Sequence, residues 1–356
     1  MNKLFSDITV IELAGVLAGP SVGLFFAELG AKVIKIENPK TDGDVTRSWK
    51  LHDENAFEKE SAYYWSINAG KNVLFLDLSD EKDLSQFYTI IKTSDILISN
   101  YKLGDDIKLK VDYSTLKNIN PGLIYASING FGTTSSRTAY DLILQAESGF
   151  MFMNGEKDAK PLKMPVAMID ILAGHQLKEG VLLALLKKYK TLTGSYISVS
   201  LFDTAVASLA NQATNWLIAH HLPKAQGSLH PNIAPYGEIF TTNDEQAVTF
   251  AIGNNKQFKS LCDILNLELY LLSDYIDNQQ RVSHRDMLYV ELENTIRKFK
   301  FEELFERCLK LDVPIGKIRN LKEVFELPEA KELINTFTFN GKEIQTVRST
   351  SFKFEG

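Results

Sequence analysis

The alternation of strand and helix signals over the first 130 residues most constrains how this chain can fold. Helical patterns at 19–30, from Ser79 to about Thr93, and at Tyr113–Ile119 separate short apolar segments that are typical of buried strands. The expected cap of the second helix is Ser79. The predicted strands are 8–13, 32–37, 73–78, 95–100 and 122–128. This alternation predicts the α/β class, with a parallel sheet that helices cover on both faces.

The middle of the chain continues with longer helical patterns. One helix is expected at 140–153 and a long one from about 165 to 189. A strand at 196–201 and a helix at 202–220 follow. These elements extend the α/β pattern, so we assign them to the same large domain.

A segment without periodicity then divides the chain. Residues 222–235, LPKAQGSLHPNIAP, contain three prolines and one glycine and form the expected linker. After it, two paired strands and helices at about 255–265, 288–298 and 301–310 indicate a small α+β domain. The predicted organisation is a large domain, a linker, a small domain and a C-terminal segment, at 1–221, 222–235, 236–320 and 321–356.

Composition argues against several classes of function. The formal net charge is −6 and the basic residues form no long cluster, so nucleic acid is not an expected partner. The two cysteines, Cys262 and Cys308, fit a reduced, cytoplasmic compartment better than a disulfide framework. Asp7 and Glu12 interrupt the apolar N-terminal stretch, and no run is long enough for a membrane helix. The histidines are scattered without zinc-binding spacing, so we expect no metal site.

Glycine motifs for phosphate binding are incomplete. The turn from Gly15 to Gly19 lacks the Gly-x-Gly-x-x-Gly spacing that seats a pyrophosphate on a helix N-terminus. Gly70 and Lys71 lack the upstream glycine of an ATP-binding phosphate loop. The sequence therefore does not favour nicotinamide or ATP chemistry.

Basic residues gather just after one predicted strand. Asn100, Tyr101 and Lys102 lie at its C-terminal end, the edge where open α/β sheets bind ligands. Lys102 and Lys108 could meet phosphates while Tyr101 stacks on a base. The other interpretation is a solvated turn with charges of both signs, and the residues alone leave both open.

Asp170 stands at the start of the long apolar helical pattern. Burying an unpaired carboxylate costs several kcal/mol, so this residue needs a stabilising or a chemical reason. It could be the helix N-cap, an ion-pair partner or a reacting group. A cap can also react, because the helix dipole would keep the carboxylate ionised, as a nucleophile must be.

Segments along nearly the whole chain, in order, resemble the class III CoA-transferases. This group contains formyl-CoA transferase and carnitine CoA-transferase and also the α-methylacyl-CoA racemases. The first segment is VIELAGVLAGPSVGLFFAELGAKVIKIENPKTDGDVTR, residues 10–47. The later ones are ILISNYKLG, INGFG, AYDLILQAESGFM, PVAMIDILAG, LFDTAVASLANQ, HPNIAPY, GNNKQF and VPIGKIRNLKEVF. The resemblance implies a Rossmann-like large domain built from both ends of the chain, a small domain, and a homodimer of interlinked, ring-like subunits.

The resemblance also implies a mechanism. The nucleophilic aspartate of similar enzymes falls on Asp170. It attacks the thioester carbonyl of an acyl-CoA and forms an anhydride, which the released CoA thiolate converts to an aspartyl-CoA thioester. An acceptor carboxylate then runs the sequence in reverse. Acyl-CoA and a carboxylic acid are thus the expected substrates, and coenzyme A enters as a substrate with no permanently bound cofactor.

Binding residues carry over position by position. The CoA contacts fall on Val16, Leu17, Lys71, Asn100, Tyr101, Lys108, Asn129 and Gly130. The substrate-side positions are Tyr140, Gly253 and Asn254.

Several residues depart from the family pattern. Leu17 replaces a glutamine of formyl-CoA transferase, which argues against a small oxalate-like substrate held by that amide. The segment 253–258 has one glycine where that enzyme has a mobile glycine-rich loop, so a lid is not expected there. Tyr140 replaces the histidine base of the racemases, and a phenol is a poor base near neutral pH. A CoA-transferase is the favoured function; a racemase and a non-catalytic CoA-ester binder are the alternatives.

Overall fold

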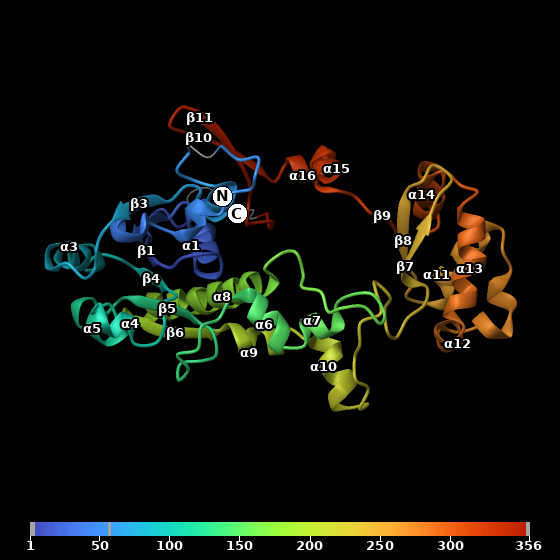
Figure 1. Ribbon diagram of the computed structural model, residues 1–356, viewed down its shortest axis with the longest axis horizontal. Helices are drawn as coiled ribbons and strands as arrows, with labels where there is room; N and C mark the ends of the chain where they lie inside the picture. The colour runs from blue at the N-terminus through green and yellow to red at the C-terminus, as the bar shows by residue number, and fades with distance from the viewer. Residues whose placement is uncertain (1–3, 56–57, 354–356) are drawn as a thin grey trace. The chain divides into compact units, whose positions relative to one another are not determined.

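The computed structural model describes residues 4–55 and 58–353, which divide into two compact units (Figure 1). The large unit comprises Met1–Phe152, Leu162–Pro223 and Glu332–Gly356, and the small unit comprises Met153–Pro161 and Lys224–Lys331. The boundaries predicted at 1–221, 222–235, 236–320 and 321–356 concern folding domains and stay predictions, which limited proteolysis would test.

A six-stranded parallel sheet forms the centre of the large unit. Its strands are β1 (Thr9–Leu13), β2 (Lys32–Glu37), β3 (Asn72–Phe75), β4 (Ile96–Ser99), β5 (Ile124–Asn129) and β6 (Ser195–Ser200). Their order is β3-β2-β1-β4-β5-β6, so the direction of winding reverses between β1 and β4. This is the doubly wound order, in which ligands bind beyond the carboxyl ends of the strands at the reversal. The predicted α/β class and parallel sheet are confirmed.

Helices cover both faces of this sheet, as Figure 1 shows. One face carries α1 (Ala18–Glu28) and α8 (Met168–Thr191), whose Phe26 and Leu177 join the buried cluster of Val10 and Val33. The other face carries α3 (Glu81–Ile91) and α5 (Tyr113–Ile119). Successive residues of a strand point to opposite faces, so a strand covered by helices on both faces is mostly apolar, apart from buried polar residues that find partners, such as Glu12 in β1. This explains why the strand segments stand out in the sequence.

Shorter elements complete the large unit. The remaining helices are α2 (Ala62–Asn68), α4 (Asp105–Lys108), α6 (Asp141–Glu147), α7 (Phe150–Met153), α9 (Leu201–Ala207) and α10 (Ala210–Leu217), with 3-10 turns η1 (Pro39–Thr41) and η2 (Val45–Ser48). The single helix predicted at 140–153 is wrong, because Gly149 adopts a positive φ of 90° between α6 and α7. The helix predicted at 202–220 is likewise divided into α9 and α10.

The predicted cap of α3 is also wrong by one residue. Asp80 is the N-cap, and its Oδ1 accepts hydrogen bonds from the N–H groups of Lys82 and Asp83 at 2.9 and 3.1 Å. The Ser79 hydroxyl instead donates to Asp77 at 2.6 Å. Both residue types are good caps, and the adjacent Asp77 decides which of them is used.

A C-terminal hairpin belongs to the large unit. It consists of β10 (Ile334–Phe339) and β11 (Lys342–Val347), which pair antiparallel. Beyond it, the N–H groups of Ser349 and Thr350 donate to the Glu28 carboxylate on α1. These contacts attach the end of the described chain to its first helix.

The small unit contains a three-stranded antiparallel sheet and helices. The strands β7 (Tyr236–Thr241), β8 (Ala247–Ala251) and β9 (Ile315–Lys317) lie in the order β7-β8-β9. The helices are α11 (Asn255–Leu265), α12 (Asn278–Ser283), α13 (Arg285–Ile296), α14 (Phe301–Lys310), α15 (Leu321–Glu326) and α16 (Pro328–Lys331), with 3-10 turns η3 (Leu269–Leu271) and η4 (Ser273–Tyr275). The predicted smaller α+β domain is confirmed, and the structure shows that its strands pair antiparallel. Throughout the described residues of both units, every helix is too short or too polar to cross a membrane.

Candidate active site

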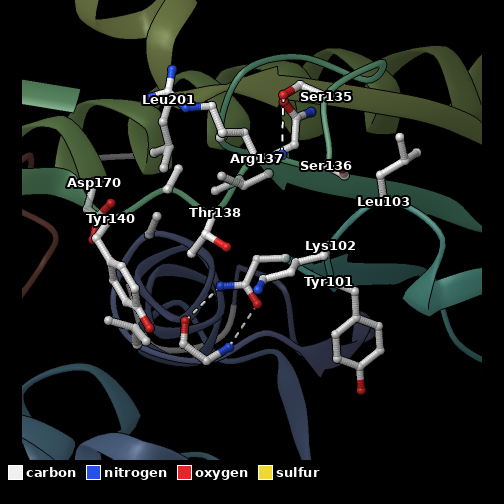
Figure 2. Close-up of a pocket in the computed structure, with 18 of the residues that line it drawn as sticks. Tyr101, Lys102, Leu103, Ser135, Ser136, Arg137, Thr138, Tyr140, Asp170 and Leu201 are labelled. Carbon is white, nitrogen blue, oxygen red and sulfur yellow. Dashed lines mark hydrogen bonds between the residues drawn. The ribbon is translucent and has the colours of Figure 1, made fainter. Parts of the chain in front are cut away.

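A cavity of about 230 Å³ opens at the reversal point of the large sheet (Figure 2). Its walls come from residues 15–18 after β1, 100–103 after β4, 128–130 at the end of β5, and 135–140 before α6, with Asp170 and Leu201. In Figure 2, Asp170 and Tyr140 lie at one side of this cavity and Tyr101 at the other. The position is the one that doubly wound sheets use for ligands.

Most of the predicted site residues line this cavity. They are Val16, Leu17, Asn100, Tyr101, Asn129, Gly130, Tyr140 and Asp170. Segments from five parts of the sequence therefore converge on one cavity.

The other predicted residues lie elsewhere. The Lys71 side chain is 0% exposed, and its Nζ donates to Pro20 O at 2.9 Å and pairs with Glu12 at 2.8 Å. Lys108 is exposed in α4 and pairs with Asp105 at 3.0 Å. Gly253 and Asn254 belong to the small unit, where the Asn254 side chain caps α11.

Asp170 is not the N-cap of its helix. Ala167 occupies the cap position of α8 without a side-chain hydrogen bond, and Asp170 lies in the first turn. A residue from α6 provides the cap, because Asp141 Oδ1 accepts from Ile169 N at 2.8 Å and from Asp170 N at 3.4 Å. The cap alternative for Asp170 is therefore wrong. The backbone of Asp170 is instead fixed by Asp141.

The Asp170 carboxylate is buried without a partner. Asp170 is 8% exposed, and within 4–55 and 58–353 no donor forms a hydrogen bond to its carboxylate. Burial, and then the negative charge of Asp141, raise the pKa of Asp170 to about 7. Burial and Asp141 therefore oppose the helix dipole, which is expected to favour the ionised carboxylate. A strongly shifted carboxylate in a cleft is typical of reacting groups.

The turn after β1 has an unusual backbone. Val16 has a φ of 70°, a left-handed conformation that β-branched residues rarely adopt and that costs about 1–3 kcal/mol. The Asn100 side chain holds the preceding residue: Gly15 N donates to Oδ1 at 3.1 Å, and Nδ2 donates to Gly15 O at 2.8 Å. The Asn100 amide is therefore engaged with the protein backbone.

A cluster of buried charges lies beneath this turn. Lys35 Nζ pairs with Glu12 Oε1 and Asp44 Oδ2, each at 2.9 Å, and donates to Ala14 O at 2.6 Å. Burial alone would lower the pKa of Lys35, but Glu12 and Asp44 together raise it. Burial lowers the pKa of Lys71 to about 8 although Glu12 opposes this. Each charge of this cluster, which we call the Lys35 cluster (Glu12, Lys35, Asp44 and Lys71), has an opposite charge beside it.

Two residues near Asp170 are absent from the sequence-based predictions. Asp141 lies within the quoted segment AYDLILQ, but only the fold brings its carboxylate to the start of α8. Tyr63 is the second, since burial and then the charges of Asp170 and Asp141 raise the pKa of its hydroxyl to about 12. No local pattern in the sequence identifies either role.

Potential metal ligands do not gather. Among the residues that the structure describes, no group of three or more His, Cys, Asp or Glu side chains could hold a metal ion.

Comparison with known proteins agrees with the geometry. The model of CoA-transferase family III matches residues 5–355. Succinate–glutarate CoA-transferase of Agrobacterium fabrum is 37% identical over 333 residues, which cover 92% of this chain and 82% of that protein. Human succinyl-CoA:glutarate CoA-transferase is 35% identical, with 92% of this chain and 74% of that protein covered. Acetyl-CoA:oxalate CoA-transferase of Acetobacter aceti is 33% identical, with 91% and 83% covered.

Solved structures show the same fold. A CAIB/BAIF family protein from Brucella suis superposes with a TM-score of 0.84 at 35% sequence identity, covering 99% of this chain and 93% of that one. The family resemblance that the order of the sequence segments indicated is confirmed: the chain belongs to CoA-transferase family III.

Proposed function

We propose that this enzyme transfers CoA from an acyl-CoA to a dicarboxylic acid, with Asp170 as the nucleophile. The observation that carries the proposal is the buried, unpaired Asp170 carboxylate on the wall of the cavity. The names of the similar enzymes support the choice of acid, because glutarate, succinate and oxalate are all dicarboxylates.

Each chemical step balances without a proton donor. The ionised Asp170 oxygen bonds to the thioester carbonyl carbon, the C–S bond breaks, and its electron pair leaves with sulfur as CoA thiolate. The thiolate then attacks the aspartyl carbonyl of the anhydride, which releases the first acid as a carboxylate and leaves an aspartyl-CoA thioester. The acceptor carboxylate and the thiolate repeat the two steps in reverse. Every leaving group departs as an anion, so an uncompensated carboxylate with no neighbouring base suits this chemistry.

Backbone N–H groups support the developing negative charge. Leu17 and Ala18 lie at the start of α1 on the wall of the same cavity. Within the described residues, neither N–H group donates a hydrogen bond. Donors of this kind stabilise a tetrahedral oxyanion, and the helix dipole adds to the effect.

The nucleotide end of CoA is assigned to the residues after β4. Tyr101 and Lys102 line the cavity, and the exposed Lys108 follows in α4, where its side chain can turn to a phosphate. Asn129 and Gly130 line the same cavity at the end of β5. Lys71 is left out of this proposal because its ammonium is held by Glu12. The substrate-side roles of Gly253 and Asn254, and the interlinked homodimer, rest on the family resemblance; a monomer in light scattering at micromolar concentration would contradict the dimer.

The test is a mass-spectrometric transfer assay. The protein is incubated with succinyl-CoA, glutaryl-CoA or acetyl-CoA and each of several free dicarboxylic acids, and new acyl-CoA esters are measured. Wild type should form them, and Asp170→Ala should abolish turnover while CoA still binds. Full activity of Asp170→Ala would overturn the assignment of the nucleophile.

A further inference from the structure

The strained turn after β1 needs an element that holds it. Val16 keeps its positive φ although valine disfavours that region, and such a conformation persists only where the surroundings determine it. The strained residue lines the same cavity as Asp170. Its backbone direction decides where the chain enters α1, so it also decides where the Leu17 and Ala18 N–H groups point.

The Asn100 side chain is that element. β1 and β4 are neighbours, with Leu13 opposite Ser99 in the last pair of the ladder. Beyond this pair, the Asn100 amide provides the donor and the acceptor that bind the two polar groups of Gly15. Gly15 directly precedes Val16, so its peptide groups cannot rotate freely while Asn100 holds them.

The resemblance suggested that Asn100 contacts CoA. In the structure, both ends of its amide are instead used on Gly15, at 3.1 and 2.8 Å. We propose that Asn100 is a positioning residue: it holds the Gly15–Val16 turn in its strained form so that the start of α1 faces the reacting carbonyl. This inference rests on the proposed function for its catalytic meaning.

Glycine at position 16 gives a direct test of this clamp. Glycine adopts positive φ about as readily as negative φ, so Val16→Gly removes the strain that Asn100 must oppose. Asn100→Ala should lower kcat by roughly 10²-fold, because a displaced turn misplaces the N–H donors. In the Val16→Gly background, the same Asn100→Ala change should cost at least tenfold less. The dissociation constant of free CoA should change by less than about threefold.

A second asparagine provides the matched control. At the end of the sheet where the strands begin, Asn120 precedes β5, and its amide also binds backbone groups. Nδ2 donates to Ile91 O and Ser94 O, and Oδ1 accepts from Gly122 N. Asn120→Ala should lower the Tm while kcat stays near that of wild type. Asn100→Asp, which keeps the acceptor for Gly15 N and loses the donor, replaces Asn100→Ala if the latter does not fold.

The outcomes separate the two roles. A kcat loss that Val16→Gly rescues, at constant CoA affinity, supports the clamp. A rise in the CoA dissociation constant with unchanged kcat, and no rescue, overturns it and makes Asn100 a CoA contact. If wild type transfers no CoA, the proposed function fails, and thermal unfolding still decides on the clamp: Asn100→Ala should lower the Tm by a few degrees less in the Val16→Gly background, and additive Tm shifts would overturn it.

Discussion

Two buried sets of charges in the large unit follow opposite rules. In the Lys35 cluster, every charged group has an opposite charge within 2.9 Å, although these side chains are almost completely buried. Asp170 is also buried, yet the charge that shifts its pKa is that of another carboxylate, Asp141. The same unit therefore neutralises one set of buried charges and leaves one carboxylate uncompensated.

The difference distinguishes structural from reactive groups. Paired charges beneath the cavity fix the backbone, since Lys35 also binds Ala14 O at 2.6 Å. An unpaired carboxylate has no such structural use, and its burial is unfavourable. Its presence therefore indicates a reacting group.

Breaking the paired set should have the largest effect on stability. Lys35→Met removes the cation that Glu12 and Asp44 share, so Glu12 keeps Lys71 while the buried Asp44 loses its ion pair, which should cost roughly 3–5 kcal/mol of unfolding free energy. Denaturant unfolding measures this change. Replacing the exposed Lys259, which pairs with Asp263 at 2.7 Å on the surface, by Met is the matched control and should cost less than about 1 kcal/mol. Equal effects at both lysines would contradict the view that burial makes the cluster structural.

Replacing the unpaired Asp170 carboxylate by a neutral amide should stabilise the protein above about pH 4. The pKa of Asp170 is raised from 3.8 to about 7 in the folded state, so between these values the folded protein holds a proton that the unfolded chain has lost. Stability contributed by this group is therefore present below about pH 4 and is lost as pH rises to 7. Asp170→Asn should match wild type near pH 4 and gain about 4 kcal/mol at pH 8, because a shift of about three pKa units corresponds to about 1.4 kcal/mol per unit.

Thermal unfolding across this pH range measures the difference. Asp53→Asn, at an exposed position, controls for the loss of one surface carboxylate. A wild type that gains stability over Asp170→Asn as pH rises would show that the folded state stabilises the Asp170 anion.

Removing the neighbouring charge should shift the pH dependence of catalysis. Asp141→Asn keeps an oxygen to accept from Ile169 N but removes the negative charge that raises the pKa of Asp170. We expect kcat/KM of wild type to rise with pH and to show an inflection near pH 7, where Asp170 ionises. Because burial remains in Asp141→Asn, this inflection should move down by about one pH unit or less. An inflection that moves up, or does not move in an otherwise folded variant, would remove Asp141 from the electrostatics of the site.

The racemase alternative predicts an effect where transfer predicts none. Tyr140 lines the cavity, and the family resemblance implies that it replaces the histidine base of the racemases. Racemisation needs a base on each face of the α-carbon, and the phenol of Tyr140 is a poor base near neutral pH. Incubation of a 2-methylacyl-CoA with the enzyme in D2O should therefore give no enzyme-dependent α-deuteration. Rapid exchange that is lost in Tyr140→Phe would favour the racemase.

Local pattern was enough for much of the fold. The helix expected at Tyr113–Ile119 has those bounds in the structure, because its apolar spacing and flanking residues act within one segment. Gly149 interrupts the helix expected at 140–153, but the apolar periodicity continues across it, so the pattern predicts one helix where there are two. Long-range contacts escape such reasoning: Lys71 binds Glu12 across 59 residues, and Asp141 caps a helix that begins 27 residues later.

The site depended still more on tertiary structure. Several candidate residues of the cavity were predicted through the family resemblance, but the pairing of Asn100 with Gly15 was not. The left-handed backbone of Val16 has no sequence signal, since valine is among the residues least expected there. Likewise, only the folded environment makes Asp170 an uncompensated carboxylate.

Covalent trapping tests most directly whether this uncompensated carboxylate is the reacting group. The enzyme is incubated with an acyl-CoA that it turns over, quenched with hydroxylamine, digested and examined by mass spectrometry. We predict a hydroxamate on the peptide that contains Asp170, formed together with loss of activity and absent without acyl-CoA. Continued turnover with an unmodified Asp170 peptide, or a hydroxamate on another residue, would contradict the assignment.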